Sequence, residues 1–205
     1  MEVRFCDEQP FGFSWIVVDE PATRTSHALV AGGRVWLVDP VDWPEAIDRA
    51  VAAGTPAGIV QLLDRHNRDC RELAQRLAVP HLATPAAIPE SPFHVLEIRR
   101  SRLWREVALW WPDTSTLAVA EAIGTNRFFA PRDGAGVHLL LRLRPPRAAL
   151  GGLSPEHLLV GHGEGLHGSA AADALHGALD HARSDLPRAL VQLPSLAADA
   201  RRRRR

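Results

Sequence analysis

Two short polar segments of this 205-residue sequence combine residue types that can bind a metal ion or move a proton. The first, residues 64–69 (DRHNRD), places acids, an imidazole and guanidinium groups within six positions. The second is Gly161-His162-Gly163, in which the glycines let the backbone approach a partner closely. Imidazole nitrogens and carboxylate oxygens are usual zinc ligands, and the same groups act as general acids and bases. Each segment is therefore a candidate for ligand binding or for acid–base chemistry.

Simpler interpretations of both segments remain open. Asp64 and His66 are two positions apart, so on an extended turn they can share one face as an acid–base pair. A salt bridge from Asp64 to Arg65 or Arg68 would explain the same residues without any catalysis. His162 is expected to act as a ligand or general base, or else to be solvated in a flexible turn.

Predicted strands end directly before both polar segments. Residues 57–63 and 157–160 are short apolar runs rich in aliphatic side chains, which is typical of buried strands. After the first segment, an apolar stripe predicts a helix over residues 70–77. The polar residues are thus expected at the carboxyl ends of strands, where open α/β sheets usually place ligands.

The rest of the chain alternates predicted strands with a few helices. Helices are expected at 43–53 and 169–182, and strands at 13–17, 27–30, 34–38, 79–82, 95–98, 106–111 and 117–122. The pattern predicts an α/β (α+β) protein. Because there is no repeat and no interior linker, we expect one domain over residues 1–196, followed by a disordered arginine-rich tail at 197–205.

Composition excludes several classes of function. All 24 basic residues are arginine, so Schiff-base chemistry and a P-loop, which need lysine, are excluded. Five of them form the terminal run Arg201–Arg205, which leaves 19 basic against 24 acidic residues in the remainder. This mildly acidic body predicts no specific nucleic-acid partner, and the sequence has no long apolar run, so we expect no membrane partner and a cytoplasmic protein.

The strand, polar turn and helix at 57–77 resemble the metal-binding segment of the metallo-β-lactamase fold, whose motif is His-x-His-x-Asp-His. The likeness extends over roughly residues 13–180. Of the four ligand positions in this motif, only His66 keeps the family residue, and the others hold Asp64, Arg68 and Asp69. Three later family positions, two histidines and a metal-bridging aspartate, are occupied here in chain order by Arg102, Glu121 and His162. The last of these retains the family histidine, in a Gly-His-Gly turn after a strand.

The resemblance implies an αββα sandwich of two mixed sheets flanked by helices. It also implies that a retained metal, zinc or another divalent ion, would be held among Asp64, His66, Asp69, Glu121 and His162. Arg68 and Arg102 cannot bind a cation, because arginine stays protonated. We expect these two arginines to form forked salt bridges with Asp64, Asp69 or Glu121.

Two functions follow from this interpretation. The first is a protein with an eroded metal site and no cofactor, non-catalytic or binding a small anion, with Arg68, Arg102 and Glu121 contacting the small-molecule ligand. The alternative is a single-metal hydrolase of an ester, thioester or lactone, in which Asp64, His66 and His162 are catalytic.

Overall fold

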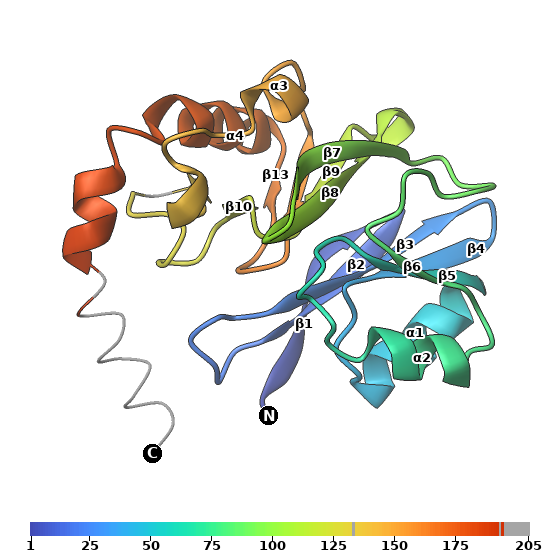
Figure 1. Cartoon of the computed structure of the whole chain (residues 1–205). Helices are drawn as coiled ribbons and strands as arrows, with labels where there is room; N and C mark the ends of the chain where they lie inside the picture. Colours follow the sequence, from blue (N-terminus) through green and yellow to red (C-terminus); the bar gives the residue numbers. More distant parts are fainter. Residues whose placement is uncertain (133, 193, 195–205) are drawn as a thin grey trace.

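The computed structural model describes residues 1–132, 134–192 and 194 of the chain (Figure 1). The predicted tail at residues 197–205 lies outside the described residues, and so does the end of the predicted domain at residue 196. Its boundaries therefore stay a prediction.

The first half of the chain forms a six-stranded sheet in the order β1-β2-β3-β4-β5-β6. The first four strands pair antiparallel, and β4, β5 and β6 pair parallel. The parallel strands are joined through two helices, as parallel neighbours require. The elements are β1 (Val3–Gln9), β2 (Gly12–Val17), β3 (Thr25–Ala31), β4 (Arg34–Val38), α1 (Pro44–Ala53), β5 (Thr55–Gln61), α2 (Cys70–Arg76) and β6 (His81–Ala83).

The second half forms a five-stranded sheet in the order β13-β12-β9-β8-β7. Strands β9 and β12 pair parallel, and the other neighbours pair antiparallel. The strands are β7 (His94–Ser101), β8 (Trp104–Trp111), β9 (Thr116–Val119), β12 (His157–Val160) and β13 (Leu166–His167). The other elements are η1 (Pro112–Thr114), the small sheet of β10 (Ile123–Gly124) and β11 (Gly136–Val137), η2 (Leu139–Leu141), α3 (Arg147–Leu150) and α4 (Ser169–His181).

The two sheets face each other, with α1 and α2 outside the first sheet and α3 and α4 outside the second (Figure 1). Alternation along a strand separates the apolar layers, because successive side chains point to opposite faces. In β4, Trp36 and Val38 enter the core between the sheets, whereas Val35 and Leu37 pack in the cluster that includes α1 and α2. The predicted αββα layout is confirmed.

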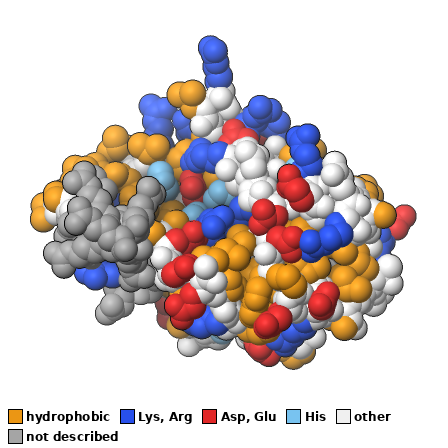
Figure 2. Space-filling view, turned by 90° about the horizontal axis from the view of Figure 1, so that it is seen from below, with side chains coloured by type: hydrophobic (Ala, Val, Ile, Leu, Met, Phe, Trp, Pro, Cys, Tyr) orange, Lys and Arg blue, Asp and Glu red, His pale blue; other side chains and the backbone are white. Residues whose placement is uncertain are grey.

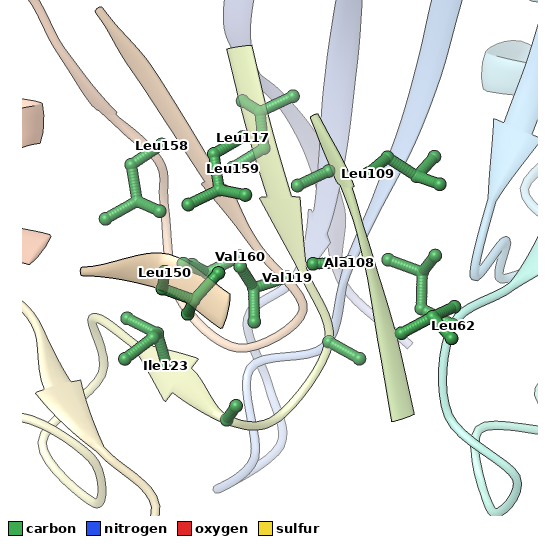
Figure 3. Close-up of a cluster of buried hydrophobic side chains, with 14 of the residues drawn as sticks. Leu62, Ala108, Leu109, Leu117, Val119, Ile123, Leu150, Leu158, Leu159 and Val160 are labelled. Atoms are coloured by element: carbon green, nitrogen blue, oxygen red, sulfur yellow. The ribbon is translucent and has the colours of Figure 1, made fainter. Parts of the chain in front are cut away.

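Aliphatic side chains of the second sheet are buried on both of its faces (Figure 3). Leu109 and Leu117 lie on neighbouring strands, and because Leu109 pairs with Ala118, the two leucines point to opposite faces. Both are almost fully buried. No helix in the described part of the chain combines the length and apolar character needed to cross a bilayer.

Leu117→Ala is expected to lower the free energy of unfolding by about 2–5 kcal/mol, because the truncated side chain leaves a cavity in a packed layer. Urea unfolding followed by circular dichroism measures this. Leu103→Ala is the matched control, since Leu103 is 86% exposed and its loss should change stability by less than about 0.5 kcal/mol. Equal losses in both variants would contradict the placement of Leu117 in the core.

Candidate metal centre

Three ligand-type side chains meet where the two sheets come together. His66 lies in the turn between β5 and α2, Glu121 lies two residues after β9, and His162 lies two residues after β12. Val119 pairs with Val160 in the parallel ladder, so Glu121 and His162 leave the sheet side by side. The cluster therefore draws one residue from the first sheet and two from the second.

The ligand atoms of the cluster form a nearly equilateral triangle. The two Nε2 atoms of His66 and His162 are 3.3 Å apart, and Oε1 of Glu121 is 3.6 Å from the first and 3.7 Å from the second. A tetrahedral zinc ion with bonds of 2.0–2.2 Å separates its ligand atoms by about 3.4 Å. The donor types and the spacing both fit one such ion.

Each imidazole turns its Nε2 inward because its other nitrogen is held by an oxygen. His66 Nδ1 is 2.8 Å from Oδ2 of Asp39, and His162 Nδ1 is 2.8 Å from the carbonyl oxygen of Ala22. Both oxygens only accept, so each Nδ1 carries a proton, and each Nε2 faces the triangle, where it can bind a cation or a second proton. The three facing atoms require a cation or a proton among them.

Glu121 is shared between the cluster and Arg65. Its Oε2 accepts a 2.5 Å hydrogen bond from Nη2 of Arg65, which leaves Oε1 for the histidines. The guanidinium of Arg65 also lies 4.0 Å from the ring centre of Trp104, a cation–π contact that restricts its position. Arg65 thus orients the carboxylate without contacting the ligand atom.

The electrostatics of the cluster favour a positive charge among its ligand atoms. Burial and Arg68 act to lower the pKa of His66, but Asp39 and Glu121 outweigh them and raise it. Burial, with Arg68 and His66 nearby, lowers the pKa of His162, so its ring is neutral at pH 7. Burial would raise the pKa of Glu121, but His66 and Arg65 outweigh it and lower the pKa. Burial likewise fails to raise the pKa of Asp39, because His66 and Arg68 lower it. Both carboxylates are therefore charged at neutral pH.

The glycines beside His162 are required by close backbone contacts. A Cβ at Gly161 would lie 2.4 Å from the carbonyl oxygen of Ala120, so only glycine lets these two chain segments approach. Gly163 has φ of 100°, in a region that favours glycine, and a Cβ there would meet Thr125 Oγ1 at 2.2 Å. These contacts set the spacing between His162 and Glu121.

Comparison with solved structures identifies the architecture. The chain aligns with the DIM-1 metallo-β-lactamase at a TM-score of 0.62 and 14% identity, covering 89% of this chain and 99% of that chain. DIM-1 exposed to ceftazidime gives a TM-score of 0.58 at 12% identity, covering 89% and 98% of the two chains.

A metallo-β-lactamase from Erythrobacter litoralis gives a TM-score of 0.56 at 13% identity, with 88% of this chain and 93% of that chain covered. The chain has the metallo-β-lactamase fold. No protein-family model matches its sequence, and neither does any curated protein. Within the metallo-β-lactamase fold, the triangle of ligand atoms lies at the end of both sheets, and Figure 2 shows histidine side chains among charged groups on that face.

Two of the five predicted metal-binding residues are turned away from the triangle. Asp64 accepts a hydrogen bond from the backbone N–H of Arg105 at 3.2 Å, and its own N–H donates to the carbonyl of Arg105. Asp69 accepts from the backbone N–H of Asp42 at 2.7 Å. His66, Glu121 and His162 are the predicted ligands that the fold brings together.

The expected salt bridges of Arg68 and Arg102 are wrong. Arg68 donates instead to three backbone carbonyls, which belong to Thr25 (2.5 Å), Asp39 (2.6 Å) and Gly161 (2.9 Å). The backbone of Arg68 has a φ of 40°, in the left-handed region. This conformation turns the chain after His66 and directs the guanidinium to the place where the two sheets meet. Arg102 is exposed in the turn between β7 and β8 and forms no salt bridge with an acid among the described residues.

Two residues of the site were not identified from the sequence. Asp39 holds His66, and its Oδ1 also accepts from the backbone N–H of Leu62 at 2.9 Å. Arg65 holds Glu121, and it occupies a position that the His-x-His-x-Asp-His motif leaves unspecified. The sequence contained one indication of the role of Asp39, which is its position directly after a buried strand. That strand pairs parallel with the strand before His66.

Arg68→Ala is expected to lower the free energy of unfolding by about 2–4 kcal/mol, because three carbonyls between the sheets lose a hydrogen bond from the guanidinium. Urea unfolding at pH 7 measures this. Arg71→Ala, which removes an exposed arginine on α2, is the control and should change stability by less than about 0.5 kcal/mol. A loss no larger than the control's would contradict a structural role for Arg68.

Proposed function

We propose that the chain binds one divalent metal ion, with zinc as the best fit, through His66, Glu121 and His162. The supporting observation is the triangle of two Nε2 atoms and one carboxylate oxygen with edges of 3.3, 3.6 and 3.7 Å. Three protein ligands are the usual number in a catalytic zinc site, where a fourth position takes water. Two of the ligands are imidazoles held by oxygen acceptors, an arrangement that raises ligand basicity.

We further propose that this site hydrolyses an ester, thioester or lactone. A bound zinc ion would lower the pKa of its water toward neutrality and polarise the substrate carbonyl. The chain's own residues hold the three ligand atoms and exclude bulk water on most sides, since the side chains of His66 and His162 are 7% and 9% exposed. Glu121, at 17%, lies nearest the open side, where substrate would enter.

The second candidate is a non-catalytic protein that binds a small anion at an eroded site. The observation that favours it is the fixed positive charge of Arg68 beside the cluster, together with the two acidic residues that point elsewhere. Because Nη1 and Nη2 of Arg68 are engaged by carbonyls and its Nε is buried without a partner, an anion would have to use Arg65. The geometry supports the single-metal hydrolase better.

Zinc titration of protein purified without chelator is expected to give one ion per chain in isothermal calorimetry. His162→Ala should weaken zinc binding by about 100-fold or more, because it removes one of three ligands. Ester turnover should then be lost in the same variant and on addition of EDTA.

His181→Ala and Asp64→Asn are the controls for this titration. His181 lies at the exposed end of α4, and Asp64 is turned away from the triangle, so both variants should bind zinc as the parent does. A parent protein that takes up no stoichiometric metal, yet is stabilised by small anions, would favour the second candidate.

Asp39→Asn is expected to weaken zinc binding by about 10–100-fold without removing a ligand, because it takes the carboxylate away from His66 Nδ1. The dissociation constant from calorimetry is the measurement. Asp42→Asn is a matched control close by in sequence, since Asp42 pairs with Arg76 at the surface. Unchanged affinity in Asp39→Asn would show that His66 does not depend on this carboxylate.

A further inference from the structure

A buried carboxylate in the second sheet holds the segment that carries Glu121. Glu106, in β8, is 1% exposed, and its Oε1 accepts hydrogen bonds from the backbone N–H groups of Glu121 and Ala122, both at 2.8 Å. Its Oε2 accepts from Nε1 of Trp104 at 2.7 Å. Burial raises the pKa of Glu106 to about 7, and the three N–H donors act against that rise because they bind the charged form. At pH 8 the side chain is therefore mostly a carboxylate that accepts from three donors.

The two backbone bonds to Glu106 begin where the pairing of β8 with β9 ends. The last pair of that ladder is Leu109 and Ala118. Farther along the chain, the N–H groups of Glu121 and Ala122 are bonded to the Glu106 side chain instead of to a neighbouring strand. The course of the backbone at this proposed ligand thus depends on one carboxylate.

A second route leads from Glu106 to the carboxylate of Glu121. The guanidinium of Arg65 lies 4.0 Å from the ring centre of Trp104, the residue whose indole N–H donates to Glu106. Arg65 in turn donates to Oε2 of Glu121 at 2.5 Å. The side chain that holds the backbone of Glu121 therefore also holds the ring against which Arg65 orients the carboxylate.

The backbone of Glu106 is tied to the turn that carries His66. Glu106 forms an isolated antiparallel bridge with Leu63. Backbone hydrogen bonds of 2.9 and 3.0 Å complete the pairing of residues 105–107 with residues 62–64. The N–H of His66 then donates to the carbonyl of Leu63 at 2.9 Å. One residue of the second sheet thus contacts the segments that carry two proposed ligands.

We propose that Glu106 is a positioning residue of the metal centre, which fixes Glu121 relative to His66. This inference rests on the proposed function, because the two residues need a fixed spacing as ligands of one ion. The hydrogen bonds that reach Glu106 all come from neutral N–H groups. Burying a carboxylate costs free energy, which an apolar side chain at this position would avoid. The position therefore serves the geometry of Glu121 more than the stability of the fold.

Glu106→Gln tests this role, because an amide cannot accept hydrogen bonds at both ends. When the amide oxygen faces the two backbone N–H groups, the amide NH2 group faces Nε1 of Trp104, which is also a donor. Calorimetry at pH 8 is expected to show zinc binding weakened about tenfold or more. The visible absorption of protein loaded with one equivalent of Co²⁺ should change as well, because it reports the geometry of the ligands.

Trp104→Phe is the second variant, which removes the same hydrogen bond and keeps a ring for Arg65. Its zinc binding should be weakened about three- to tenfold, and it carries the test if Glu106→Gln does not fold. In the double variant the introduced amide no longer meets a donor. Zinc binding should then be weakened by less than the product of the two single effects.

Thr116→Val is the matched control, because Thr116 is 1% exposed at the other end of β9 and its Oγ1 lies 2.8 Å from the hydroxyl of Thr114. Loss of this buried hydrogen bond should lower stability and leave the zinc affinity and the Co²⁺ spectrum as in the parent. Parental affinity and spectrum in both Glu106→Gln and Trp104→Phe, or an equal loss of affinity in Thr116→Val, would overturn the positioning role and leave the metal centre standing. A parent protein that binds neither zinc nor Co²⁺ would overturn both proposals.

Discussion

The guanidinium of Arg68 joins the two sheets at the end where the candidate site lies. It donates to carbonyls at the start of β3, after β4 and after β12, so three segments far apart in sequence share one donor group. The backbone N–H of Thr25 adds a direct bond to Gly161 at the same place. Only a planar group with several N–H donors satisfies so many carbonyls at once. The cluster depends on this junction, because Gly161 precedes His162 and Asp39 holds His66.

The geometry of the cluster is set by backbone pairing more than by its own side chains. The parallel ladder of β9 and β12 fixes where Glu121 and His162 leave the sheet. The parallel pairing of β4 and β5 places Asp39 beside the turn that carries His66. The hydrogen-bond partners of the three ligand side chains then fix only their last torsions. These partners are Asp39, the backbone carbonyl of Ala22 and Arg65. Such support from rigid strands is what allows three ligand atoms to stay within 3.7 Å of one another.

The sequence predicted the architecture and part of the site. The strand, turn and helix at 57–77 and the Gly-His-Gly turn are local patterns, so their elements could be assigned correctly. The roles of Asp64 and Asp69 could not, because they depend on the left-handed backbone at Arg68 and on a contact with Arg105, 41 residues away.

The arginines illustrate the same limit. Salt bridges to acids are the default expectation for arginine, but the carbonyls that bind Arg68 come together only once both sheets have formed. Arg102 was assigned to the site by alignment with a family turn, whereas here a tight hairpin between β7 and β8 carries it into solvent. Long-range pairing, which leaves no mark in a local window, decided both positions.

The charges around the triangle cancel in pairs. Asp39 and Glu121 supply two negative charges, and Arg65 and Arg68 supply two positive ones within the same small volume. A divalent cation at the triangle would thus add two positive charges to surroundings that screen poorly. A carboxylate product would be attracted to such a site after cleavage, and added salt would weaken that attraction.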